Sequence, residues 1–402
     1  MIRGREELLA LEERTLASYA SRSSQSRGRR YPEEAPNLRT AHQRDRDRVL
    51  HSEAFRRLQH KTQVFVVQEG DYYRTRLTHT IEVSQIARSL AAFLAVNSEL
   101  ADCIALMHDL GHPPFGHQGE VELDALAKRH GLPGFDHNLH CLRIVDHLER
   151  RYPYPGLNLT WEAREGIGKH RTKFDHPDTP EEFRDTPQPG IEAQIANVSD
   201  ILAYVTHDLE DALYYSFFTL DELSALGLPL IDEAIAQAGL RGTAPRRYVR
   251  HGALTRLIIG SLVHHTLDET ERRLAALGPN PTPAQVRASS EPTIALPEPV
   301  EEQVEALIGF LLKRVYRHPS VEIMCHKGRR LLRDLFEHLM EHPGHLPRLE
   351  QERMEREGVD LEDEQALARA VLDHVAGLTD RHVVLLHEQI FSPHSRLLPT
   401  ID

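Results

Sequence analysis

The sequence predicts an all-α protein, and three observations support this fold class. Apolar residues recur at helical spacing through most of the chain. Glycines and prolines gather between these segments and mark where helices end. A strand pattern is found only in one short candidate hairpin at 64–73, and the chain contains no internal repeat. A length of 402 residues leaves room for two or three domains or for one large helical body.

The composition is that of an ordinary globular protein, with 40% hydrophobic and 27% charged residues and a mean hydropathy of -0.45. The net charge is -13, from 48 Lys and Arg against 61 Asp and Glu, which argues against general attraction to nucleic acids or anionic membranes. No apolar run approaches the ~20 residues that span a bilayer, and the N-terminus lacks a secretory pattern. We therefore expect a cytoplasmic protein without a membrane partner, whose three distant cysteines are reduced.

The first hundred residues contain three predicted helical segments. Residues 1 to about 20 form an amphipathic helix, and 21–30 form a flexible loop rich in Ser and Arg. The second helical segment begins near Asn37. The third, 76–96, places one set of apolar residues on a single face: Leu77, Ile81, Ile86, Leu90, Phe93 and Leu94. His79 lies near that face, where a histidine is by default a core residue.

The stretch HDLGHPPFGHQGE, at 108–120, is the most informative part of the sequence. An apolar run leads into the pair His108-Asp109, and Gly111 and two prolines end the helix directly afterwards. An imidazole nitrogen beside a carboxylate oxygen suits a divalent transition metal or magnesium, although such a pair can also be a simple hydrogen bond at a helix end. Further acid and base groups on the same turn favour a metal site with catalytic groups beside it. They are His112, His117 and Glu120.

Beyond residue 120 the pattern stays helical, with two main interruptions. The proline-bearing loop 172–190 precedes a strongly helical block at 191–213. In that block four polar residues follow one line along the helix, and the first has unusually apolar neighbours: Asp200, Tyr204, Asp208 and Asp211. The segment 278–301 is rich in Pro, Ser and Ala without periodicity, which predicts a linker or excursion. The helices that follow it are expected to end near Leu386.

Taken in order, these motifs resemble those of the HD-domain phosphohydrolases, and specifically of the bacterial deoxyguanosinetriphosphate triphosphohydrolase-like branch. The resemblance covers about 30–215 and rests on RDRDRVLHSEAFRRLQHKTQVF, TRLTHTIEVSQIAR, HDLGHPPFGHQGE, GFDHN, GLNLT and NVSDILAYVTHDLEDA; VYRHPSV is similar more loosely. It implies an HD-domain helical bundle enlarged by C-terminal helices. The expected parts are an N-terminal helix and basic loop (1–36), an HD-type catalytic domain (37–277), the linker or excursion (278–301) and a C-terminal helical region packed on the catalytic domain (302–402).

The resemblance also implies the site residues. The family's metal quartet falls on His79, His108, Asp109 and Asp200. Its catalytic pair falls on His117 and Glu120, with His112 as a further phosphate-facing histidine and His137 as an auxiliary one. A set of two imidazoles and two carboxylates leaves open positions on a six-coordinate ion for water and a phosphate oxygen.

Substrate contacts follow the same resemblance. Gln63 and Asp208 match residues that hold the deoxyribose 3′-hydroxyl, and Tyr204 matches an aromatic residue that packs against the sugar. Arg76 and Lys169 match triphosphate-binding positions, which would give an acidic protein a local positive pocket. The vertebrate SAM-and-HD-domain relative has a lysine after the last metal aspartate. This chain has Ile201 there, so we expect no phosphate contact from that position. The family's base-reading residues are not identifiable in this sequence, so the resemblance implies no preference for guanine.

The leading hypothesis is a metal-dependent dNTP triphosphohydrolase that releases a deoxynucleoside and triphosphate. The metal would be Mg or Mn, with Co, Ni or Fe as further candidates. The alternatives are another HD phosphohydrolase, acting on nucleoside monophosphates or cyclic dinucleotides, or a nucleotide-sensing or weakly ssDNA-binding protein that uses the basic loop Arg22 to Arg30. By analogy with the family, we expect a homo-oligomer (a hexamer or a dimer-based assembly) and activation by a second dNTP.

Overall fold

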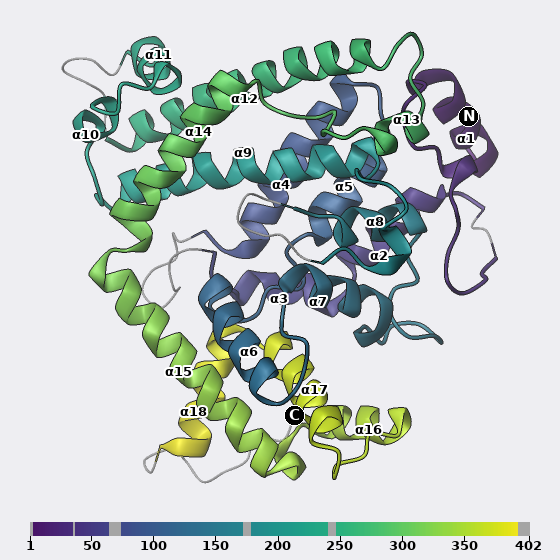
Figure 1. Ribbon diagram of the computed structural model, residues 1–402, viewed down its shortest axis with the longest axis vertical. Coiled ribbons are helices and arrows are strands. Elements are labelled where there is room, and N and C mark those ends of the chain that lie inside the picture. Colours follow the sequence, from purple (N-terminus) through teal and green to yellow (C-terminus); the bar gives the residue numbers. More distant parts are fainter. Residues whose placement is uncertain (1–2, 35–36, 64–73, 172–177, 240–246, 393–402) are drawn as a thin grey trace.

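The computed structural model describes residues 3–34, 37–63, 74–171, 178–239 and 247–392, and these form a helical protein (Figure 1). In the described ranges extended pairing is limited to two isolated bridges, Arg29 with Thr160 and Thr62 with Thr75. The all-α prediction is therefore confirmed. The candidate hairpin at 64–73 lies outside the described residues.

The larger part of the molecule is built around three helices that pack on one another: α4 (Arg76–Phe93), α5 (Ser98–Met107) and α9 (Ile191–Tyr214). The other helices of this part are α1 (Arg5–Thr15), α2 (Ala41–Leu50), α3 (Glu53–Arg57), α7 (His137–Arg143), α8 (Trp161–Gly168), α10 (Leu220–Ser224), α11 (Pro229–Gln237), α12 (Arg247–Ala276), α13 (Pro283–Ala288) and α14 (Glu298–Leu311). Apart from α1, which has no buried residue, these helices share one core, in which α5 is buried from Leu100 to Met107. A helix that is buried in this way belongs in the middle of a protein, and α2, α4, α8 and α9 all pack against α5.

A second core joins α6 (Gly116–Arg129) to the C-terminal helices (Figure 1). Those helices are α15 (Pro319–Glu341), α16 (Arg348–Glu357), α17 (Glu364–Gly377) and α18 (Asp380–Phe391). Leu123 and Leu126 of α6 are fully buried against apolar side chains of α15 and α17. Thus α6, which follows the HD turn in the sequence, packs in a different core from the helix that precedes that turn. The last helix ends at Phe391 rather than near Leu386.

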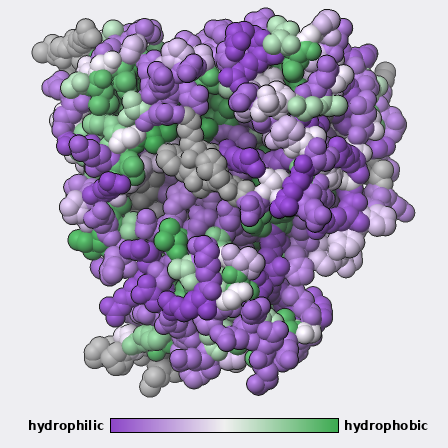
Figure 2. Space-filling view, viewed as in Figure 1, coloured by the Kyte–Doolittle hydropathy of each residue, from purple (hydrophilic) through white to green (hydrophobic). Residues whose placement is uncertain are grey.

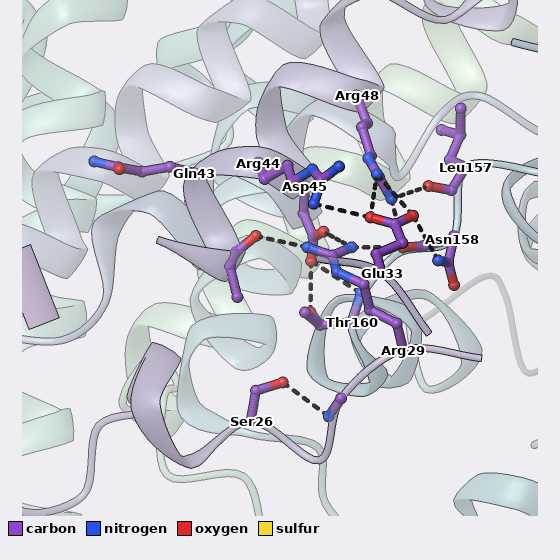
Figure 3. A network of polar contacts seen from close by, with 12 residues as sticks. Ser26, Arg29, Glu33, Gln43, Arg44, Asp45, Arg48, Leu157, Asn158 and Thr160 are labelled. Carbon is purple, nitrogen blue, oxygen red and sulfur yellow. Dashed lines mark hydrogen bonds and ion pairs between the residues drawn. The ribbon is translucent and has the colours of Figure 1, made fainter. Parts of the chain in front are cut away.

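The segment 21–30, expected to be a flexible basic loop, is instead fixed against the body of the protein. The guanidinium of Arg29 donates to Asp45, whose other oxygen accepts from the backbone N–H of Thr160 at 3.0 Å (Figure 3). Each other arginine of the segment also has partners: Arg22 with Glu13, Arg27 over the ring of Trp161, and Arg30 with Asp146 and Glu182. The expectation was wrong because composition shows neither which acidic groups nor which carbonyls a basic segment meets in the fold.

The N-terminal helix is also shorter than predicted, since α1 ends at Thr15 and not near residue 20. The proline-rich segment 278–301 differs from a linker as well. It contains α13, and it buries Val286 and Ile294 in the first core. Arg287 forms an ion pair of 2.9 Å with the buried Glu165. Apolar residues at irregular spacing give no periodic signal, so the sequence did not reveal this packing.

The described surface is largely hydrophilic, and hydrophobic side chains gather at the upper left of Figure 2, over α10, α11 and α14 of Figure 1. No described helix combines the length and the apolar composition that a bilayer crossing requires.

Candidate metal centre and active site

A cavity of about 760 Å³ lies between α4, α9, α14 and the turn that joins α5 to α6. Most of the predicted site residues line it: Gln63, Arg76, His79, His108, Asp109, His112, His117, His137, Lys169, Asp200 and Tyr204. The two other predicted residues, Glu120 and Asp208, lie behind the residues that line the cavity. Glu120 contacts His117 and His137, and Asp208 contacts Tyr316, which itself lines the cavity.

The three central helices bring the predicted metal quartet together. His79 is on the first turn of α4, His108 caps the end of α5, and Asp200 is on α9. The Nε2 atom of His79 lies 2.9 Å from Oδ1 of Asp200, and Nε2 of His108 lies 3.5 Å from the same oxygen. Nε2 of His108 is also 3.5 Å from Oδ1 of Asp109. Potential ligand atoms of His79, His108 and Asp109 thus lie within 4.8 Å of one another, and Asp200 contacts both imidazoles.

The buried atoms at this point fit a cation. Nδ1 of His108 must carry the hydrogen, because it lies 2.7 Å from the carbonyl oxygen of Ala105 and a carbonyl only accepts. This fixes the ring with Nε2 toward the two aspartates, as metal-bound histidines are commonly held. Among the described residues, His108 Nε2 and Asp109 Oδ2 are buried without a hydrogen-bond partner. Such atoms cost free energy unless an ion or water satisfies them.

The electrostatics of the quartet also favour a cation. Burial opposes ionisation of Asp200, but His108 and the other neighbouring imidazoles hold the pKa of this carboxyl well below its usual range. Burial likewise lowers the pKa of His108, yet Asp109 and Asp200 outweigh it and raise that pKa to about 9. Two buried, ionised carboxylates thus favour positive charge beside them, which a divalent ion would supply.

Arg76 and His112 hold the other side of Asp109. The guanidinium of Arg76 and Nδ1 of His112 each lie 2.9 Å from Oδ1 of Asp109, the same oxygen that lies nearest His108, while Oδ2 is buried without a hydrogen-bond partner among the described residues. Burial opposes ionisation of Asp109, but Arg76 keeps the pKa of this carboxyl well below its usual range. Arg76 is itself almost fully buried, so its charge is fixed beside the metal ligands rather than free on the surface.

A second group of acid and base side chains lies beside the quartet. Oε2 of Glu120 is 3.3 Å from Nδ1 of His117, and Oε1 is 2.9 Å from Nδ1 of His137. Burial opposes ionisation of Glu120, but these hydrogen bonds keep its pKa well below its usual range. His117 is 55% exposed, and its ring lies 5.3 Å from that of His112. The four side chains also lie close enough together to hold a cation of their own.

The backbone of the HD turn explains this geometry. Gly111 allows the turn to touch α7: a Cβ there would lie 1.9 Å from the carbonyl oxygen of His137. Phe115 then adopts the left-handed conformation, with φ +64°, and starts α6 at Gly116. The turn therefore sets both the distance of His112 from His137 and the direction of the helix that carries His117.

The predicted substrate residues differ in whether their polar atoms already have hydrogen-bond partners within the protein. Oε1 of Gln63 is buried and has no hydrogen-bond partner in the described part of the chain. Lys169 is buried, and its ammonium group donates to Oγ1 of Thr186 at 2.7 Å and to the carbonyl oxygen of Thr186 at 2.8 Å. It therefore lies at the cavity wall with hydrogen bonds that a phosphate would have to replace. Asp208 accepts a hydrogen bond from the hydroxyl of Tyr316.

Two residues of the site were missed in the sequence. Nε2 of His170 lies 3.7 Å from Oδ2 of Asp200, and its Nδ1 lies 2.6 Å from Oδ1 of Asn197. Its position next to Lys169 was the only available signal. Tyr316 lies in the motif VYRHPSV, which indicated the region but not the contact with Asp208.

Comparison with known proteins agrees with this geometry. Residues 76–205 match the HD domain, and 294–389 match the phosphohydrolase-associated domain. Among curated proteins, the chain is similar to the deoxyguanosinetriphosphate triphosphohydrolase-like proteins of Syntrophus aciditrophicus (42% identity over 98% of each chain) and Geobacter sulfurreducens (43%, over 98% of this chain and 99% of the relative). That of Paracoccus denitrificans is 44% identical over 92% of this chain and 97% of the relative.

We predict that Gly111→Ala damages both stability and activity, because the added methyl group forces the HD turn away from α7. The free energy of unfolding should fall by ~1–3 kcal/mol, the usual range for overpacking. Gly260→Ala is the matched control, since nothing lies within 4 Å of a Cβ at that helical position. It should be neutral or stabilising by up to ~1 kcal/mol. Equal denaturation midpoints for the two variants would contradict the role of Gly111.

We also predict a pH-dependent stability that originates at Asp208. Burial raises the pKa of this carboxyl to about 7, above its value in the unfolded chain. The folded state therefore binds the extra proton, and this contribution is present at pH 4 and lost as the pH rises through 7. The free energy of unfolding of the wild type, compared with Asp208→Asn, should fall between about pH 4 and pH 7 by at most ~1.4 kcal/mol per pH unit and should level off above pH 7. Denaturation curves with the same pH slope for both proteins would disprove this assignment.

Proposed function

Because the chain belongs to the deoxyguanosinetriphosphate triphosphohydrolase-like proteins of the HD-domain phosphohydrolases, we propose that it is a metal-dependent dNTP triphosphohydrolase. The observation that carries this proposal is the arrangement of His79, His108, Asp109 and Asp200, which line one cavity together with His117 and of which His108 and Asp109 keep buried polar atoms without a hydrogen-bond partner in the described part of the chain. The products would be a deoxynucleoside and intact triphosphate.

The quartet would hold one divalent ion, with Mg or Mn as the first candidates and Co, Ni or Fe as others. The ion would supply a Lewis acid for a phosphate oxygen and for the attacking water. The protein supplies the rest of the centre. His108 is oriented by Ala105, and Asp109 is held by Arg76 and His112, so the ligands keep their positions without relying on exposed loops.

His117 is the proposed acid or base. Its Nδ1–H is directed to Glu120, which leaves Nε2 to exchange a proton with the attacking water or the leaving oxygen. Glu120 is in turn fixed by His137, through both the ring Nδ1 and the backbone N–H. Glu120 therefore sets the tautomer and direction of the His117 ring, while His112 lies between this group and Asp109.

Arg76 and Lys169 are the proposed triphosphate contacts, and they explain how a protein of net charge -13 can hold a polyanion. Arg76 is already beside the metal ligands, whereas Lys169 would exchange its bonds to Thr186 for phosphate oxygens. Gln63 and Asp208 are the proposed contacts of the 3′-hydroxyl, and Tyr204 of the sugar ring. The unpartnered Oε1 of Gln63 supports its part of this assignment.

Two alternatives remain as outcomes of the experiments. Another HD phosphohydrolase would use the same metal centre on a nucleoside monophosphate or a cyclic dinucleotide. The ssDNA-binding alternative relied on the arginines of 21–30, and these are engaged with acidic groups, carbonyls or Trp161 within the protein. Assembly into a hexamer or dimer-based oligomer, activation by a second dNTP and a cytoplasmic location remain proposals taken from the family.

The deciding experiment is a screen of all dNTPs and NTPs, singly and in mixtures, with Mg or Mn. We expect tripolyphosphate and a deoxynucleoside as products, with no turnover after chelation. Asp200→Asn should lose both the bound metal and turnover, whereas the exposed control Asp221→Asn should keep them. Orthophosphate, or a linear dinucleotide from a cyclic one, would instead indicate the other phosphohydrolase activities.

His117→Ala and Glu120→Ala should each lower kcat by ~10²–10⁴ while the metal stays bound, because they act on the proton and not on the ion. The measurements are kcat and metal content per protein. His264→Ala, at an exposed position on α12, is the control. Unchanged kcat in both catalytic variants, with metal retained, would remove this pair from the mechanism.

A further inference from the structure

The corner between α17 and α18 contacts two walls of the active site. Asp380, the first residue of α18, is buried and accepts hydrogen bonds from the backbone N–H of Thr62 at 2.9 Å and from that of Phe115 at 3.0 Å. Its carboxylate also accepts from the hydroxyl of Thr62. Thr62 lines the cavity next to Gln63, and Phe115 ends the HD turn. The carboxylate of Asp380 thus joins the segment of Thr62 to the HD turn at Phe115, although the three residues are far apart in the sequence.

A buried lysine makes a second bridge at the same corner. Nζ of Lys61 donates to the carbonyl oxygen of His112 at 2.5 Å and to that of Ala376, near the end of α17, at 3.1 Å. Lys61 is only 3% exposed, so water does not compete strongly for these bonds. The HD turn is therefore held to the C-terminal helices at two points, His112 and Phe115.

The second of these points is a strained one. A residue with a side chain rarely adopts the left-handed conformation that Phe115 has, so its surroundings must hold it there. Asp380 fixes its N–H, and Gly328 of α15 packs so closely that a Cβ there would lie 2.7 Å from the Phe115 ring. Because α6 begins at the next residue, this peptide sets the direction of the helix that carries His117 and Glu120.

We propose that Asp380 is a positioning residue for the reaction: it joins the segment of Thr62 to the peptide of Phe115 and so aims His117 and Glu120 at the cavity. The C-terminal helices then complete the active site, although they contribute no metal ligand of the quartet. This inference rests on the proposed function for its effect on turnover. Its structural part, the clamp on the HD turn, does not depend on the substrate.

The matched comparison is Asp373 of α17, a second buried carboxylate in the same helices. It forms a bidentate pair with Arg143, at 2.6 and 2.8 Å, and a further contact with Arg353 at 3.3 Å. These partners do not line the cavity. A purely structural role for both carboxylates would give Asp380→Asn and Asp373→Asn the same phenotype.

The test measures both variants in the full-length, metal-loaded protein. In Asp380→Asn the amide nitrogen cannot accept, so the N–H of Thr62 or Phe115 loses its partner. We expect kcat to fall roughly 10- to 100-fold, as small misplacements of catalytic groups do, with KM changed less than about threefold. Amide hydrogen exchange in a peptide covering 109–123 should become faster. Asp373→Asn should lose stability but keep kcat and that exchange rate.

Retained kcat and unchanged exchange in Asp380→Asn would overturn the proposal, and so would equal losses in both variants. If Asp380→Asn does not fold, Thr62→Val and Thr62→Ser replace it. Thr62→Val removes the hydroxyl donor and should lower kcat and make amide exchange faster. Thr62→Ser keeps a hydroxyl and should show the kcat and the exchange rate of the wild type. If amide exchange is faster in Asp380→Asn but the wild type releases no triphosphate, the clamp on the HD turn is supported and the proposed function is refuted. If the wild type releases triphosphate but exchange in Asp380→Asn is unchanged, the proposed function is supported and the clamp is refuted.

Discussion

The burial of two carboxylates, Asp109 and Asp200, is the constraint on which the rest of the structure depends. Ionised groups are costly away from water, so each must be compensated by neighbouring positive charge. Arg76 compensates one oxygen of Asp109, while the imidazoles of His79 and His108 face Asp200. The packing of α4 and α9 on α5 creates this environment. The fold therefore buries the two carboxylates and brings imidazoles beside them, a donor set that suits a divalent cation.

The two cores have separate tasks at this site. The first core holds the candidate metal ligands on α4, at the end of α5 and on α9, whereas the second holds α6, which carries His117 and Glu120. The HD turn crosses from one core to the other within a few residues, between Asp109 and Gly116. A reaction that needs the water, the ion and a proton-transfer group within contact distance requires the two cores to keep a fixed relation. The hydrogen bonds of Lys61 and Asp380 hold the HD turn at His112 and Phe115, in the stretch where the chain passes from the first core to the second.

Much of the fold and of the candidate site could be predicted from the sequence, because helices and motifs depend on residues that are close together along the chain. The apolar spacing of 76–96 predicted α4, and HDLGHPPFGHQGE indicated the candidate metal pair and the residues of the turn. The errors concern segments whose role depends on partners far along the chain. Arg29 was assigned to a flexible loop because Asp45 and Thr160 become its neighbours only in the fold (Figure 3). Val286 and Ile294 gave no periodic signal, although both are buried in the first core.

The sequence by itself determined the all-α class, the family and the identity of the residues available for chemistry, since residue type and helical period need no partner. Only the tertiary structure decided which of these residues meet. It placed His170 beside Asp200, put Asp208 behind Tyr316, and engaged Lys169 with Thr186. It also joined Thr62 to Asp380, which are 318 residues apart. The physical reason is that hydrogen bonds and ion pairs act over a few ångströms in space, while periodicity reports only neighbours along the chain.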